Sequence, residues 1–156
     1  MRHLYRLAAG LSAALLSACS LSTGFRPGIA ADLPPDAPVI VALSEARVRP
    51  AVGAHLAFWP RSSDVLRSLA DQPGLVGYGV RIEPFGTRAW TMTVWQDEAS
   101  LAGFVKGAAH GRAVAEGLPA LADARFARLR TRRGDTPLSW EEAIDRLARD
   151  GRPYYE

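Results

Sequence analysis

The first nineteen residues most constrain what this 156-residue chain can fold into. Arg2 and Arg6 precede an apolar stretch from Leu7 to Leu16, which has the length of a signal-peptide core and is too short to span a bilayer. We therefore predict that residues 1–18 are a signal peptide and take no part in the fold. The stretch leads to Cys19, the only cysteine, so the domain that follows has no internal disulfide and must rely on its apolar core.

The four residues that close this stretch, Leu16-Ser17-Ala18-Cys19, resemble the lipobox of bacterial lipoproteins. In that motif the cysteine thiol receives a diacylglycerol and becomes the new N-terminus after cleavage. The resemblance implies that Cys19 anchors the protein to a membrane, where each buried methylene contributes roughly 0.8 kcal/mol. Ser20 differs from the aspartate that tends to retain lipoproteins at the inner membrane, which favours the periplasmic face of the outer membrane. A plain signal peptide cut near the same point is the alternative.

The charge of the chain changes when the leader is removed. Lysine plus arginine falls from 19 to about 17 against 16 acidic residues, so the formal net charge falls from +3 to about +1. This balance gives no support for a nucleic acid as a partner.

The remaining chain divides by composition into two parts. Residues 19–37 are rich in glycine and proline and show little periodicity, which predicts a flexible tether between the lipid and the domain. Residues 38–156 have the usual size of one domain and contain no internal repeat.

Apolar periodicity and capping residues predict the elements of this domain. In order they are strand 39–48, helix 60–70, strand 75–83, strand 88–96, a helix capped by Asp97, strand 125–133 and helix 139–149. The last helix is the best defined, because Ser139 and Glu142 form a reciprocal capping box. Gly151 stands where a left-handed C-terminal cap is expected.

This order is the plan of a ferredoxin-like α+β fold, βαββαβ, with an extra C-terminal helix. The plan places two helices on one face of a four-stranded antiparallel sheet and leaves the other face bare in a monomer. Strand 88–96 has no clearly polar face, which indicates an interior strand. We therefore predict that two copies pair as a homodimer.

Four separated parts of the chain carry a family resemblance. They are Pro73-Gly74-Leu75-Val76-Gly77-Tyr78; Trp90-Thr91-Met92-Thr93-Val94-Trp95; Ala102-Gly103-Phe104-Val105 with Ala109-His110-Gly111-Arg112; and Leu138-Ser139-Trp140-Glu141-Glu142-Ala143. Together they resemble the dimeric α/β-barrel superfamily, and within it the uncharacterised relatives of antibiotic biosynthesis monooxygenases and of spheroidene monooxygenase. The resemblance covers residues 40–148 and implies that two subunits close their sheets into a barrel, with a cavity in each monomer.

Two chemistries follow from the resemblance. Some members oxidise aromatic polyketides without metal or flavin, by holding the substrate against O2 in an apolar pocket. Others, including spheroidene monooxygenase, bind haem, and for that chemistry His110 is the candidate ligand. An unbroken helix from Asp97 would turn His110 towards solvent, and only a break near Gly107 would redirect it. A solvated histidine near a helix end is the alternative.

Large side chains on the predicted strands are candidates to line a cavity. Tyr78, Trp90, Met92 and Trp95 suit a planar apolar ligand, although core packing or a dimer interface would use the same residues. His55 has no carboxylate near it in sequence and is expected in a loop or at the edge of the core.

Other catalytic signatures are missing from the sequence. It contains no phosphate-binding glycine loop, dinucleotide fingerprint, metalloprotease helix or nucleophile elbow, so the catalytic residues stay unassigned and no metal site is predicted. Two functions remain open. One is an oxygenase-like enzyme for a small apolar or aromatic molecule, and the other is a lipid-anchored binding or structural module that kept the fold without the chemistry.

Overall fold

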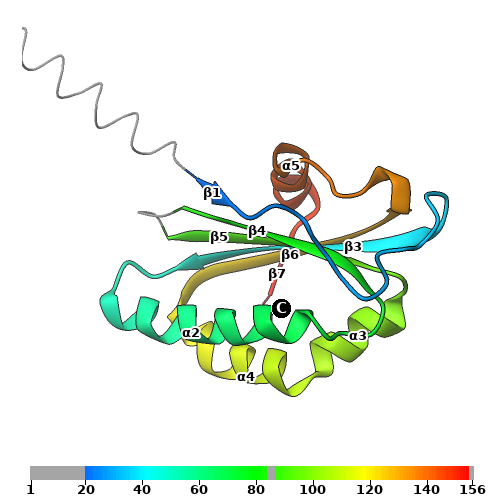
Figure 1. Ribbon diagram of the computed structural model, residues 1–156. Helices are drawn as coiled ribbons and strands as arrows, with labels where there is room; N and C mark the ends of the chain where they lie inside the picture. Colours follow the sequence, from blue (N-terminus) through cyan, green and yellow to red (C-terminus); the bar gives the residue numbers. More distant parts are fainter. Residues whose placement is uncertain (1–19, 84–86, 155–156) are drawn as a thin grey trace, which may run out of the picture.

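A computed structural model describes residues 20–83 and 87–154 (Figure 1). The predictions for the leader and for Cys19 therefore lie outside the described residues. The strands are β1 (Leu21–Ser22), β2 (Arg26–Pro27), β3 (Pro38–Val48), β4 (Leu75–Ile82), β5 (Arg88–Trp95), β6 (Leu121–Arg132) and β7 (Arg152–Pro153). The helices are α2 (Val52–Leu69), α3 (Glu98–Lys106), α4 (Ala108–Gly117) and α5 (Trp140–Asp150), with 3-10 turns at Leu118–Ala120 and Arg133–Asp135.

The strands of the described residues form one antiparallel sheet in the order β1-β4-β5-β3-β6-β7, and β2 also pairs with β4. Its four central strands, β4-β5-β3-β6, have the ferredoxin-like arrangement, so the predicted α+β fold is confirmed. Strand β5 lies between β4 and β3, as its two apolar faces predict.

Helix α2 is longer than the sequence predicts. It begins at Val52, and Pro60 lies inside it instead of at its first turn. A proline is preferred where a helix starts, because its missing N–H is not needed there, but a longer helix can accommodate one at the cost of one backbone bond. His55 therefore lies on a helix and not in a loop.

The second helical region is broken. Asp97 caps α3, since its Oδ1 accepts the Ser100 backbone N–H at 2.7 Å, and this bond holds the pKa of Asp97 below its usual value. The chain then leaves the helix at Gly107, where φ is −64° and ψ is 150°, and α4 begins at Ala108. The break changes the direction of every side chain that follows.

One face of the sheet packs against α5, which Figure 1 shows on the side opposite α2, α3 and α4. The buried residues of this layer are Val39, Val41, Leu43, Val76, Trp90, Met92, Val94, Ala127, Ala143 and Leu147. The prediction that this face stays bare in a monomer is therefore wrong, because the C-terminal helix covers it. Pairing of two copies stays a prediction, and a second copy would have to contact another surface.

The segment before β3 also covers this face. We call residues 21–33 the N-terminal strap. The backbone N–H groups of Thr23, Gly28 and Ala30 donate to carbonyl oxygens of β4 at 2.9, 3.0 and 2.8 Å. The prediction of a flexible tether over residues 19–37 is therefore wrong for the strap, which is an ordered part of the sheet layer.

Glycines in β4 explain why the strap fits so closely. A Cβ atom at Gly77 would overlap the ring of Phe25, and one at Gly79 would lie 3.4 Å from the indole of Trp140 in α5. Two positions without a side chain thus make room for two aromatic rings on the same face. Gly28 of the strap is packed as closely, because a Cβ atom there would overlap the Leu75 carbonyl oxygen, so this glycine serves close packing instead of flexibility.

Helix α5 follows its sequence signals closely. Ser139 Oγ accepts the Glu142 backbone N–H at 3.1 Å, which confirms the cap of the helix predicted over 139–149. Gly151 donates its N–H to the Leu147 carbonyl at 3.0 Å. Its φ of −67° is not left-handed, so that part of the prediction is wrong.

Candidate functional site

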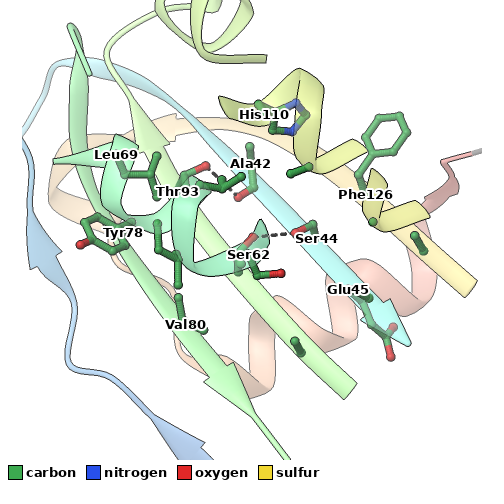
Figure 2. Close-up of a pocket in the computed structure, with 18 of the residues that line it drawn as sticks. Ala42, Ser44, Glu45, Ser62, Leu69, Tyr78, Val80, Thr93, His110 and Phe126 are labelled. Carbon is green, nitrogen blue, oxygen red and sulfur yellow. Dashed lines mark hydrogen bonds between the residues drawn. The ribbon is translucent and has the colours of Figure 1, made fainter. Parts of the chain in front are cut away.

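The other face of the sheet is hollow. Helix α2 lies over this face, yet of its 18 residues Leu69 alone is buried. Val65 and Leu66 are only partly buried, although both pack towards the layer beneath. A cavity of about 900 Å³ lies between α2, α4 and the sheet (Figure 2). Cavities of this size accommodate small organic ligands.

Small side chains on the two central strands create this space. Those that line the cavity are Ala42, Ser44 and Ala46 of β3 and Ala89, Thr91 and Thr93 of β5. Successive side chains of a strand point to opposite faces, and the neighbours of these residues on the α5 face are large. The alternation of small and large residues therefore places the void on one face and the packed core on the other.

Hydroxyl groups lie on this otherwise apolar floor. Ser44 Oγ and Thr91 Oγ1 are 2.6 Å apart and share one hydrogen bond, which uses one of their two O–H groups. Thr93 Oγ1 accepts the indole N–H of Trp95 at 2.8 Å. The Ser44 and Thr91 pair can therefore still donate one hydrogen bond to a ligand in the cavity.

His110 lies in the wall of the cavity (Figure 2). The break at Gly107 redirects it, so the alternative of a solvated histidine at a helix end is wrong. Its ring meets Phe104 edge-on, with centroids 5.2 Å apart. Burial lowers the pKa of His110 from its ordinary 6.5, while a hydrogen bond to the Val105 backbone acts in the opposite direction. The imidazole is therefore mainly neutral at neutral pH and can accept a proton or donate a lone pair.

The other predicted residues are divided between the two faces. Tyr78 lines the cavity, as the sequence suggested. Trp90 and Met92 instead lie in the core beneath α5, and Trp95 is fully buried in a second core cluster. His55 is not among the lining residues, and its Nδ1 accepts the Trp59 indole N–H at 3.1 Å. The alternation of residues along β5 defines its two faces, but it does not indicate which face α5 covers and which lines the cavity.

Several charged side chains that line the cavity form ion pairs. Glu45 lies 3.8 Å from Arg88, Arg128 lies 3.9 Å from Glu98, and Arg61 pairs with Glu116.

Within residues 20–83 and 87–154, no three histidine, cysteine or acidic side chains come together as a metal site. None of the helices described combines the length and the apolar character needed to cross a bilayer.

Comparison with known proteins identifies the class of fold. No known family matches the sequence, and neither does any curated protein. Among solved structures, a candidate monooxygenase from Lactobacillus acidophilus is similar, with 12% identity and a TM-score of 0.52 over 70% of this chain and 51% of that one. A candidate antibiotic biosynthesis monooxygenase from Caulobacter crescentus has 16% identity and a TM-score of 0.52, over 60% of this chain and 90% of that one.

A conserved protein from Methanosarcina mazei matches equally well, with 16% identity and a TM-score of 0.52 over 62% of this chain and 94% of that one. The chain thus spans about half the length of the Lactobacillus protein, but nearly all of the other two. The α+β fold with its antiparallel sheet is therefore similar to that of these structures, two of which are candidate monooxygenases. At these identities the likeness extends to the fold and not to the chemistry.

The lowered pKa of His110 predicts how stability changes with pH. Between the lowered native value and the ordinary 6.5 the unfolded chain binds more protons than the native one, so the free energy of unfolding rises with pH. We expect urea unfolding to show lower stability at pH 5 than at pH 7, and His110→Gln to reduce this difference. An equal difference in both proteins would contradict the placement of His110 in the cavity wall.

Proposed function

We propose that this protein is a lipid-anchored protein of the cell envelope that binds a small, mostly apolar aromatic molecule. The observation that carries the binding proposal is the cavity of about 900 Å³ under α2, a helix that buries only Leu69. A helix laid on a sheet normally buries an apolar stripe, and a ligand would complete that burial here. The anchor is the diacylglycerol expected on Cys19.

The cavity lining defines the class of ligand. Tyr78, Val80 and Leu66 offer apolar surface, and the flat ring of Tyr78 favours a planar ring system. The Ser44 and Thr91 hydroxyl pair can donate one hydrogen bond, so a carbonyl or phenolic oxygen on the ring would gain a partner. We therefore favour a phenol, quinol or aromatic ketone over a plain hydrocarbon.

Oxidation of that ligand is the catalytic form of the proposal. His110, held neutral by burial, can accept a proton from an activated CH2 group of an aromatic substrate. The substrate then supplies the electrons and O2 accepts them: one oxygen atom replaces the two hydrogens as C=O, and the other leaves as water. The alternative is a binding module that holds the same ligand without turnover. The resemblance to dimeric barrels also leads us to propose that the protein is a homodimer, which would pair through a surface other than the face covered by α5.

A pair of phenylalanine substitutions on α2 tests the binding proposal. Ser62 points into the cavity, whereas Ala57 on the same helix is exposed and outside it. With 2-naphthol as the probe in titration calorimetry, we expect Ser62→Phe to weaken binding at least about tenfold by occupying the space, and Ala57→Phe to bind like the wild type. Equal affinity in both variants would exclude this cavity as the site.

The purified protein also distinguishes the oxygenase from the non-catalytic binding module. Mass spectrometry of the protein as purified identifies any bound molecule, and incubation of that molecule with the protein in air shows whether a product forms. A product that depends on His110 supports the oxygenase. Binding without a product supports the non-catalytic module.

Haem is a second candidate ligand, and the break at Gly107 is the observation that favours it. The break places a mainly neutral imidazole in the cavity wall, where its ring packs edge-on against Phe104, and haem iron accepts such an imidazole as its proximal ligand. The residues present thus fit an axial ligand. When bound, haem would supply the means to bind or activate O2.

Absorption spectra test this second candidate. Protein produced with haem supplied should show a Soret band, and His110→Ala should lose it, because the variant has no other imidazole in the cavity lining. His55→Ala, whose imidazole lies outside the cavity, is the matched control and should keep the band. A colourless wild-type preparation would remove haem from consideration.

A further inference from the structure

The chain enters the sheet almost directly after Cys19. Leu21 and Ser22 form β1 and pair with Ile82 and Arg81 of β4. Only Ser20 therefore separates the expected lipidated Cys19 from the edge of the sheet, and the two steps from Cys19 to Leu21 reach at most about 7 Å. An anchor of that length fixes which end of the domain lies against the bilayer.

Exposed apolar side chains gather at this same end. The large hydrophobic residues exposed in the described chain are Leu21, Ile29, Val52 and Leu56, at 61%, 64%, 78% and 71%. Leu21 lies opposite Ile82 at the end of β4, and Val52 begins α2 soon after β3 ends. Ile29 is the exception, since its neighbour Ala30 bonds to Leu75 at the other end of β4.

The register of the sheet shows that these residues share one end. Ile82 pairs with Ala89, and Arg47 near the end of β3 pairs with Arg88 at the start of β5. The ends of β3 and β4 are therefore level, as Figure 1 also shows, where β1 and the start of α2 both lie at the left of the sheet. Leu56 follows Val52 by one turn and lies on the same side of α2.

Basic side chains accompany the apolar ones. Arg47 and Arg49 are exposed on either side of the buried Val48. Arginine binds phosphate well, because its planar guanidinium carries several N–H donors. Arg49 uses its Nε–H for the Leu121 carbonyl at 3.0 Å, which leaves the N–H groups at the tip of its guanidinium for a phosphate. Apolar side chains together with nearby arginines match the two layers of a phospholipid surface.

We propose that this end of the domain, formed by Leu21, Val52, Leu56, Arg47 and Arg49, contacts the phospholipid bilayer and orients the protein on it. The inference rests on the acylation of Cys19 set out under Proposed function. Three apolar side chains are too few for stable membrane binding alone. They fix the orientation of a domain that the lipid already holds, with the sheet edge β1 towards the membrane and the start of β4 away from it.

Two single-cysteine variants test the orientation. Leu56→Cys lies at the proposed contact end, and Ile29→Cys, with similar exposure, is the matched control at the other end. Acylation blocks Cys19, so a fluorophore attaches only to the introduced thiol. The labelled full-length proteins are placed in vesicles of phosphatidylethanolamine and phosphatidylglycerol that carry a doxyl-labelled lipid quencher.

The expected result is quenching several-fold stronger at position 56 than at position 29. Equal quenching at the two positions, or stronger quenching at position 29, overturns the inference. Mass spectrometry of the same samples reports the acyl chains independently. An acylated protein with equal quenching refutes the orientation alone, whereas a protein without acyl chains refutes the anchor and the orientation together.

Discussion

The structure depends on the alternation of large and small side chains along the two central strands. Towards α5, β3 and β5 present Val41, Leu43, Trp90 and Met92, all of them buried. Burial of each such side chain contributes about 1.5–3 kcal/mol, so this layer supplies much of the stability of a domain without disulfides. On the opposite face the same strands present alanine, serine and threonine, and there the cavity forms.

Because one face of the sheet carries the packed core, the other face of this small domain can remain hollow. Because α5 and the strap complete a core on one face, α2 can lie over the other face without burying its own apolar stripe. The break at Gly107 then turns His110 into the wall of the cavity, where burial keeps the imidazole neutral. In barrels built from two subunits the first face is expected to meet a second sheet, whereas here parts of the same chain cover it.

The sequence allowed the fold to be predicted because its local signals agree with one another. Strand alternation, the Asp97 cap and the Ser139 cap each mark an element that the structure contains. The strap was missed because glycine and proline indicate flexibility when no packing partner is known. The packing partners of Phe25 and Gly28 in the strap are Gly77 and Leu75 of β4, which lie far away in sequence. Among the site residues, Tyr78 of β4 was predicted to line the cavity, and it does. The face of β5 that is covered depends on α5, which lies far away in sequence, so the placement of Trp90 and Met92 could not be predicted.

The most direct test of this account compares the accessibility of the two sheet faces. Met92→Cys lies beneath α5 at a position that is 2% exposed, whereas Val65→Cys lines the cavity from α2. In the acylated protein under native conditions, a small thiol reagent should modify Cys at position 65 quickly and Cys at position 92 only as fast as the whole domain unfolds. Rapid modification at position 92, or equal protection at both positions, would contradict a sealed face opposite a hollow one.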